Sequence, residues 1–312
     1  MLWAAALLLA VLIDGWLGEP PVRWHPVVWM GHYLGWAGKR VAPTMATPGP
    51  DYKSFSLGAL AWSAGAAIVC IAAWFVQKHI LQLSPLLAVL LLGLLLKPLL
   101  AWAMLKNEVL AVEAALATSL DAGRQRLAWL VSRDVAALTE GQVRESAIES
   151  LAENLNDSVV APIFWFALLG LPGAALYRFA NTADAMWGYR GERNGRVWEW
   201  AGKWAAWADD VLSWLPARIT AVLLMALAYR SGWRALRQQA RLTPSPNSGW
   251  PMAAMALCLG VRLGKPGVYT LNAAGRVPAS LDTHKAVFYA RNTVLAQVLL
   301  AVAAMILVEK WL

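Results

Sequence analysis

The feature that most constrains this chain is a run of about twenty residues, 57–76, without a single charged side chain. A second run, 83–105, is interrupted only by Lys97. A helix needs about 20 apolar residues to cross the roughly 30 Å hydrocarbon layer of a bilayer. No water reaches that layer, so the backbone N–H and C=O groups must bond one another, which a helix allows within one segment. These runs therefore predict membrane-spanning helices.

Composition and three further apolar runs extend this prediction. Only 15% of the 312 residues are charged and the mean hydropathy is +0.49, whereas soluble domains carry about 25% charged residues. Segments 159–180, 211–229 and 286–308 are long enough to span, and Pro172 with its neighbouring glycines predicts a kink or a turn-back in the first of them. Segment 1–13 is predicted to be a retained but short first helix, and 252–261 an interfacial or re-entrant segment.

The fold class that follows is all-α. We expect a polytopic membrane protein with about five or six helical membrane segments, some broken or re-entrant, and amphipathic helices in the polar loops. The chain is predicted to form a single polytopic domain over 1–312, in which 106–158 is a polar helical segment. The net charge of +8 suits anionic lipid headgroups and anionic substrates. It does not indicate nucleic acid, because the basic residues are dispersed among apolar segments.

The most informative polar segment is a carboxylate row in 142–157. Thr139 and Gln142 have the spacing of a capping box, which predicts that a helix begins just after Thr139. Glu145, Glu149 and Glu153 then recur every four residues. Like charges at this spacing destabilise a helix by a few tenths of a kcal/mol per pair unless cations lie against them. The row suits Mg²⁺, which prefers oxygen ligands. A solvated helix face is the alternative.

Two further segments carry polar groups next to apolar runs. Asn181 and Asp184 lie three residues apart, on one face of a predicted helix, and Arg190 follows in a stretch where arginines alternate with glycines. Arginine binds phosphate or carboxylate through two parallel donors, but an ordinary basic loop beside the membrane has the same composition. Asp209 begins an apolar span and Arg218 lies inside it. An ionisable residue at membrane depth is costly and is usually paired.

Three more side chains are candidates for a ligand site. Asn247 stands among prolines and glycine beside the membrane, and Arg262 follows the short apolar segment. His25 lies between Trp24 and Pro26 near the start of the chain. A structural turn explains the first two equally well, and a hydrogen-bonding structural role explains the histidine.

Taken together, these segments resemble one family, the membrane-bound adenosylcobinamide-phosphate synthases of cobalamin (vitamin B12) synthesis. The blocks occur in family order over nearly the whole chain. Val135, Ser248 and Lys265 depart from the residues that the family commonly has. The residues that carry the resemblance are Asp14, Gly18, Pro20, His25-Pro26-Val27, Arg133-Asp134, Glu149 to Asn154, Asp157, Ala161-Pro162, Asn181-Thr182, Asp184, Gly188-Tyr189-Arg190, Asp209-Asp210, Pro216-Ala217-Arg218, Pro246-Asn247, Gly249-Trp250-Pro251, Gly260 to Gly264 and Tyr269.

The resemblance implies an ATP-dependent amide ligation. A propionate carboxyl of adenosylcobyric acid would be joined to (R)-1-amino-2-propanol phosphate or a close analogue, with Mg²⁺ and ATP required. The expected partners are the corrinoid and the amino-alcohol phosphate, the lipid bilayer and other membrane-bound enzymes of corrinoid assembly. The expected location is the bacterial inner membrane, as a multi-pass protein.

This resemblance also suggests roles for the candidate residues. Glu149, Glu153 and Asp157 would hold Mg²⁺–ATP, with Asn154 orienting the ligands. Arg190 and Arg218 would bind phosphate or the reacting carboxylate, and Asp184 or Asp209 would be the general base. The remaining candidates would line the substrate site: His25, Asn181, Asn247 and Arg262.

Two other classes of function remain open from the sequence. One is a non-catalytic membrane regulator, since a β-lactamase-induction sensor protein is a distant relative of this family. Such a regulator would not need the carboxylate row. The other is a corrinoid transporter, which should show internal repeats of its spans.

Overall fold

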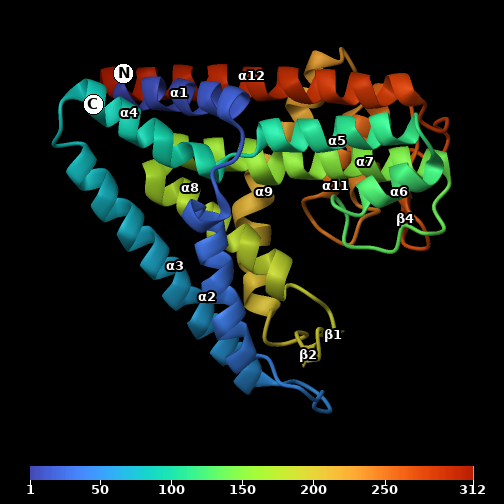
Figure 1. Cartoon of the computed structure of the whole chain (residues 1–312), viewed down its shortest axis with the longest axis horizontal. Coiled ribbons are helices and arrows are strands. Elements are labelled where there is room, and N and C mark those ends of the chain that lie inside the picture. Colours follow the sequence, from blue (N-terminus) through green and yellow to red (C-terminus); the bar gives the residue numbers. More distant parts are fainter. Residues whose placement is uncertain (312) are drawn as a thin grey trace. The chain divides into compact units, whose positions relative to one another are not determined.

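The computed structural model describes residues 1–311, apart from the side chains of Leu17, Lys310 and Trp311. Most of the described chain is helical (Figure 1). Its strands form two short antiparallel hairpins: β1 (Glu192–Arg193) with β2 (Arg196–Val197), and β3 (Leu263–Lys265) with β4 (Tyr269–Leu271). The predicted all-α class is confirmed.

Five helical stretches in residues 1–311 are long and apolar enough to cross a membrane. Each of them covers all or most of one of the five runs predicted from the sequence, so the expected number of membrane segments is confirmed. The stretches are Tyr52–Ile80, Pro85–Leu116, Glu140–Trp187, Lys203–Leu227 and Ser280–Glu309.

The helices fall into two compact units, which we describe separately. The first unit comprises residues 1–100, 161–212 and 301–312. In it, α1 lies along α4, and both α2 and α3 pack against α8. Glycines make the α3 contact possible, because a Cβ at Gly65 would lie 2.4 Å from the Tyr33 ring and 2.5 Å from the Phe179 ring. The helices are α1 (Leu2–Leu17), α2 (Pro26–Val41), α3 (Tyr52–Ile80), α4 (Pro85–Leu96) and α8 (Ala161–Trp187).

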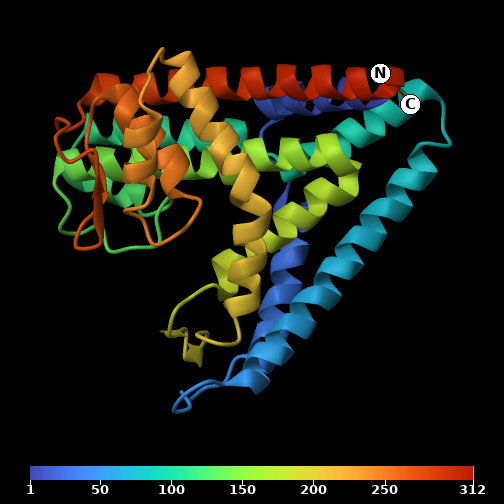
Figure 2. The same ribbon diagram turned by 180° about the vertical axis from the view of Figure 1, so that it is seen from behind.

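The predicted break in the 159–180 segment is present in α8. Gly170 leaves the helical region with φ 69° and ψ −153°, and Pro172 follows. Figure 2 shows the two arms of α8 meeting at a sharp bend. The Leu171 N–H, which the bend frees, donates to the side-chain carbonyl of Gln77 on α3 at 2.7 Å. The bend is therefore stabilised by a neighbouring helix, as breaks inside membranes require.

Two predicted helices have other boundaries in the structure: the first helix and the helix expected over 83–105. The first helix does not end near Ile13 but runs on to Leu17, with Asp14 buried inside it. The ammonium of Lys97 lies 3.7 Å from Asp14, and this nearby positive charge makes a buried carboxylate tolerable. The apolar run 83–105 is not one helix, because Pro98 falls in a 3₁₀ turn at Lys97–Leu99 that separates α4 from α5 (Trp102–Leu116).

The second unit comprises residues 101–160 and 213–300. Its centre is α7 (Glu140–Leu155), which packs against α5, α6 (Leu120–Leu127) and α11 (Gly249–Leu259). The capping box at Thr139 and Gln142 begins α7 as predicted. A π-helical turn, Asn156–Val160, follows α7. The unit also contains α10 (Trp233–Ala240) and the greater part of α9 (Lys203–Leu227) and of α12 (Ser280–Trp311).

Segment 252–261 was predicted to be interfacial or re-entrant, and the interfacial alternative was wrong. Helix α11 is buried over nearly all of its length, from Gly249 to Leu259, among the other helices of its unit. An interfacial helix would keep one polar face in water, but α11 is apolar on all sides and so packs as a core helix. The predicted single domain over 1–312 stays a prediction.

Candidate functional site

A polar cavity of about 300 Å³ lies within the second unit. It is enclosed by α7, the segment that precedes α7, the segment between α10 and α11, and the β3–β4 hairpin. The residues that line it are Leu130, Val131, Ser132, Arg133, Glu149, Ser150, Glu153, Asn154, Thr243, Pro244, Ser245, Ser248, Lys265, Val268 and Tyr269. Two carboxylates, two cations, a phenol and several hydroxyls thus converge on one space.

Glu149 is the most constrained side chain of this cavity. It is buried, with 4% of its surface exposed. One carboxylate oxygen accepts from Nη2 of Arg133 at 3.1 Å, and the other accepts from the Tyr269 hydroxyl. Burial and the adjacent Glu149 charge raise the pKa of the Tyr269 phenol, so it stays protonated and donates to the carboxylate at neutral pH.

Arg133 has hydrogen-bonding capacity that the protein does not use. Its Nη1 is buried and is among the polar side-chain atoms of the described chain that have no partner. Lys265 contributes a second positive charge to the lining, and Ser132, Ser150 and Ser248 add hydroxyls. A guanidinium, an ammonium and hydroxyl donors are the groups that bind phosphate oxygens. The cavity is therefore suited to an anionic group.

The carboxylate row of α7 is not a solvated helix face. Glu145 is buried, and its carboxylate accepts from Nε of Arg262 at 3.0 Å. Arg262 and Arg133 thus supply positive charges that offset the repulsion between the glutamates of the row. The three glutamates have different surroundings. Glu149 and Glu153 line the cavity, whereas Glu145 forms an ion pair with Arg262 outside the lining.

The donor set fits Mg²⁺ bound jointly with phosphate. Within residues 1–311 no three His, Cys, Asp or Glu side chains are grouped so as to hold a metal by themselves. Mg²⁺ does not need such a cage, because it is usually held by one or two carboxylates together with phosphate and water. Glu149 and Glu153 would be these carboxylates. Asn154 lines the same cavity, with its amide bonded to the Ser150 carbonyl at 3.0 Å.

Asp157 is placed in a different setting from the other predicted metal ligands. It lies in the π-helical turn, where the Asn156 amide donates to it at 2.8 Å. Asn156 in turn accepts from the Thr220 hydroxyl at 3.2 Å. Asp157 is outside the set of described residues that line the cavity. Its role as a ligand stays a prediction.

Arg218 and Asn247 form a cluster of their own. The guanidinium donates to the Asn247 amide oxygen and, at 3.1 Å, to the Pro246 carbonyl. It also lies over two indole rings, 4.7 Å from the centroid of Trp214 and 4.8 Å from that of Trp250. Arg218 thus has partners within the protein, as expected for an ionisable side chain in an apolar span.

The other five predicted site residues belong to the first unit. Arg190 is exposed, and Asn181, Asp184 and Asp209 are half-buried. His25 lies 3.3 Å from a carboxylate oxygen of Glu19. The structure brings none of these five into the polar cavity described here, and their catalytic or binding roles stay predictions.

Sequence reasoning did not assign Arg133 or Tyr269 to the site. Arg133 and Tyr269 stand in blocks that carry the family resemblance, and this was the available signal. Their distance from Glu149 along the chain, 16 and 120 residues, hides the contact from any local pattern.

Comparisons with known proteins identify the family to which the chain belongs. The profile of the CobD/Cbib protein family matches residues 7–296. A protein of Methanothermobacter thermautotrophicus named "Probable cobalamin biosynthesis protein CobD" is 39% identical, with 96% of each chain covered. A "Cobalamin biosynthesis protein CobD" of Chromobacterium violaceum is 41% identical, with 84% of this chain and 81% of its own covered.

A further relative, "Cobalamin biosynthesis protein CobD" of Brucella suis, is 34% identical over 95% of each chain. No solved structure matches the chain. The family profile and the full-length relatives together establish that this multi-pass membrane protein belongs to the CobD/Cbib family of cobalamin biosynthesis.

Proposed function

We propose that this protein joins a propionate carboxyl of adenosylcobyric acid to (R)-1-amino-2-propanol phosphate, or a close amino-alcohol phosphate, with consumption of ATP. In this reaction ATP phosphorylates the carboxylate, the amine nitrogen attacks the resulting acyl carbon, and inorganic phosphate leaves as the amide forms. The amine must first lose a proton from its ammonium form to a general base. Membership of a family of cobalamin biosynthesis supports the substrate class.

The observation that carries the proposal is the mixed charge of the polar cavity. Glu149 and Glu153 would hold Mg²⁺, and Asn154 would orient the ligands around it. Mg²⁺ would supply neutralisation of phosphate charge when bound. Arg133, through its unpartnered Nη1, and Lys265 would bind phosphate oxygens. A non-catalytic regulator has no need of such a set of opposed charges around one cavity.

The remaining roles keep their predicted assignment. Asp184 or Asp209 would accept the ammonium proton, and Arg190 would bind an anionic substrate group. Asp157 would complete the metal shell. Arg218, Asn247, Arg262, His25 and Asn181 would position the substrates. We also propose the cytoplasmic membrane as the location, with the ATP site on the cytoplasmic side, because ATP is a cytoplasmic substrate.

The test is a reaction of the purified full chain in detergent with adenosylcobyric acid, aminopropanol phosphate and Mg²⁺–ATP. We expect an amide product whose mass equals the two substrates less one water, with ADP and phosphate formed in equal amounts. Omission of Mg²⁺ or of the amine should abolish the product. A folded protein that forms no amide under these conditions, in the presence of all components, would contradict the proposal.

Arg133 offers a second test of the phosphate assignment. Arg133→Lys keeps a positive charge beside Glu149 but loses the spare donor of the guanidinium. We expect it to raise the KM for a phosphorylated substrate while the protein still folds. The matched control is Arg124→Lys, because Arg124 belongs to the same unit and lies outside the lining of the cavity. If Arg133→Lys left the KM for both phosphorylated substrates unchanged, the assignment of phosphate binding to this cavity would be contradicted.

A further inference from the structure

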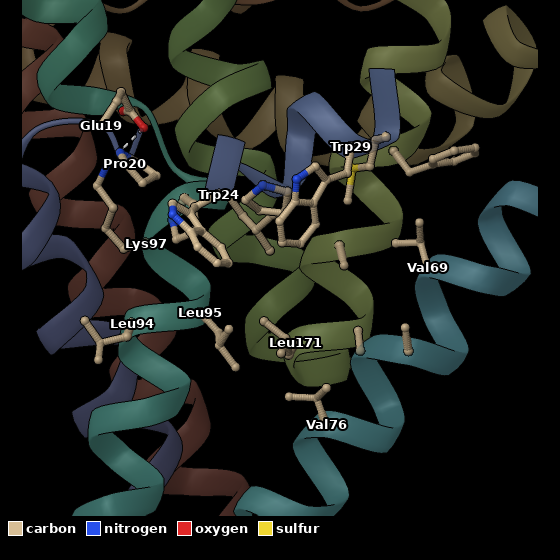
Figure 3. Close-up of a pocket in the computed structure, with 18 of the residues that line it drawn as sticks. Glu19, Pro20, Trp24, Trp29, Val69, Val76, Leu94, Leu95, Lys97 and Leu171 are labelled. Atoms are coloured by element: carbon tan, nitrogen blue, oxygen red, sulfur yellow. Dashed lines mark hydrogen bonds and ion pairs between the residues drawn. The ribbon is translucent and has the colours of Figure 1, made fainter. Parts of the chain in front are cut away.

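A second cavity, of about 710 Å³, lies within the first unit and is not used by the proposed reaction. Its lining comes from α2 and the segment before it, α3, α4 and α8. Figure 3 shows Trp24 and Trp29 at one end, Leu95 on the α4 wall, and Val69 on the α3 wall. Almost all of this lining is apolar. Water filling such a space would lack hydrogen-bonding partners, so an apolar occupant is favoured.

The walls of this cavity belong to helices that face the bilayer. Ile71 on α3 is 64% exposed and Leu86 on α4 is 79% exposed, and neither side chain lines the cavity. Both helices lie in stretches long and apolar enough to span a membrane. Large apolar side chains left uncovered on such helices are covered by lipid tails in a membrane. An occupant with a hydrocarbon chain can therefore enter this cavity directly from the bilayer.

One corner of the cavity is charged. The ammonium of Lys97 lies 2.9 Å from Oε2 of Glu19 and 3.7 Å from Asp14 (Figure 3 shows Lys97 and Glu19). The two carboxylates and one ammonium leave this group with one more negative than positive charge. His25 adjoins the same Glu19 oxygen at 3.3 Å. Lys97 is buried, with 5% of its side chain exposed, whereas Glu19 and His25 are partly exposed, at 22% and 17%.

Glu19 has an acceptor that the protein leaves unused. Its Oε1 is buried and is among the described side-chain atoms without a hydrogen-bond partner. A buried carboxylate oxygen without a donor is unfavourable, because it has lost its hydrogen bonds to water and gained none from the protein. A ligand that carries N–H donors and a positive charge would satisfy this oxygen and balance the excess negative charge.

We propose that this cavity binds one aminophospholipid of the phosphatidylethanolamine type, with its ammonium on Glu19 and an acyl chain among the α3, α4 and α8 side chains. The proposal is independent of the amide-forming reaction. A lipid is favoured over a water-soluble ammonium compound because the cavity offers mainly apolar surface. A primary ammonium is favoured over a trimethylated or anionic headgroup because Oε1 needs an N–H donor and the corner is already negative.

The experiment measures the thermal stability of the full-length protein in detergent as three lipids with identical dioleoyl chains are added. The lipids are phosphatidylethanolamine, phosphatidylcholine, which has no N–H donor, and phosphatidylglycerol, which has no ammonium. We expect phosphatidylethanolamine to raise the Tm at a concentration about ten-fold or more below the others, as a hydrogen bond to a charged group implies. Equal responses to the three lipids, or a preference for phosphatidylglycerol, would overturn the proposal.

Two variants separate the headgroup from the chain. Glu19→Gln removes the charge and should abolish the preference for phosphatidylethanolamine while chain binding remains. Ala72→Trp places an indole in the cavity from α3 and should abolish the response to all three lipids. Its matched control is Ala67→Trp, an exposed position on the same helix outside the cavity lining, which should respond like the unchanged protein.

Two further arms identify other occupants. Free phosphoethanolamine carries the headgroup without the chains, and we expect it to leave the Tm unchanged. An equal stabilisation by free phosphoethanolamine would make the site one for a soluble amine and overturn the lipid assignment. Displacement of bound phosphatidylethanolamine by adenosylcobyric acid, measured by native mass spectrometry, would assign the cavity to the corrinoid instead.

Discussion

The two cavities of this protein use buried charge in different ways. In the second unit, Glu149 and Glu153 share a polar cavity with Arg133 and Lys265, and both hydroxyl-bearing and apolar side chains complete the lining. In the first unit, the apolar cavity has charge at a single corner, where Lys97 contacts both Asp14 and Glu19.

This difference separates a site suited to chemistry from a site suited to an amphipathic guest. Charges distributed around a small enclosed space can stabilise an anion and a metal ion together. One charged corner beside an apolar wall instead orients a molecule that has one polar end. The following changes test this distinction, from the largest expected effect to the smallest.

The largest effect is expected from Glu153→Gln in the polar cavity. The change keeps the shape of the side chain and removes its charge, so we expect turnover to fall by about 100-fold or more, the range found when a residue that stabilises charge in the transition state is removed. The measurement is amide formation over a Mg²⁺ titration. Thermal stability in detergent, measured in parallel, should show that the variant is folded.

The matched control for this change is Glu140→Gln. Glu140 lies on the same helix, and its side chain is 57% exposed. It forms an ion pair with Arg144, one helical turn further along α7. We expect near-normal turnover from it. If Glu153→Gln also turned over at a near-normal rate throughout the Mg²⁺ titration, the metal assignment would fail.

The next effect concerns the charged corner of the apolar cavity. Lys97→Met keeps the length of the side chain but removes the cation shared by two buried carboxylates. Breaking a buried ion pair by removing one partner costs about 3–5 kcal/mol, so we expect a markedly lower unfolding temperature. Lys78→Met, on the exposed surface of α3, is the control and should change stability by less than about 1 kcal/mol. Equal unfolding temperatures of the two variants would show that the ion pairs of Lys97 do not stabilise the first unit.

A smaller effect is expected from Arg218→Ala. The guanidinium contacts Asn247, Pro246 and two indole rings, so its loss should lower the free energy of unfolding by about 1–3 kcal/mol. Arg218→Lys should restore only part of this, because lysine lacks the planar pair of donors. Because Arg218 is also proposed to position a substrate, we expect the KM for ATP or aminopropanol phosphate to rise in the alanine variant. Lower stability with unchanged KM values would leave Arg218 a structural role alone.

The smallest effect is expected from Tyr269→Phe. Loss of the hydroxyl bond to Glu149 should cost about 1 kcal/mol at neutral pH. Because the folded pKa of this phenol is raised above its unfolded value of about 10, its contribution is fully present below pH 10 and is lost as the pH rises further. The stability difference between the unchanged protein and Tyr269→Phe should therefore shrink in alkaline solution. A difference that grew above pH 10 would contradict the raised pKa.

Local patterns were sufficient for the helical framework. The uncharged run 57–76 lies within α3, and the capping box at Thr139 marks the first turn of α7. The glycines and proline of 159–180 indicated the break that occurs at Gly170. These features depend on residues within a few positions of one another, because helix formation, capping and breaking are decided within one or two turns.

The sequence by itself therefore determined that the chain is a helical membrane protein, and its motifs indicated the family. Tertiary structure alone decided which charges meet. Glu145 pairs with Arg262 across 117 residues, and Lys97 pairs with Glu19 across 78. The physical reason is that a buried charge needs a partner of opposite charge, but this partner can come from any position in the chain. Only the packing of distant helices places the guanidinium or ammonium beside its carboxylate, and this packing also creates the two cavities.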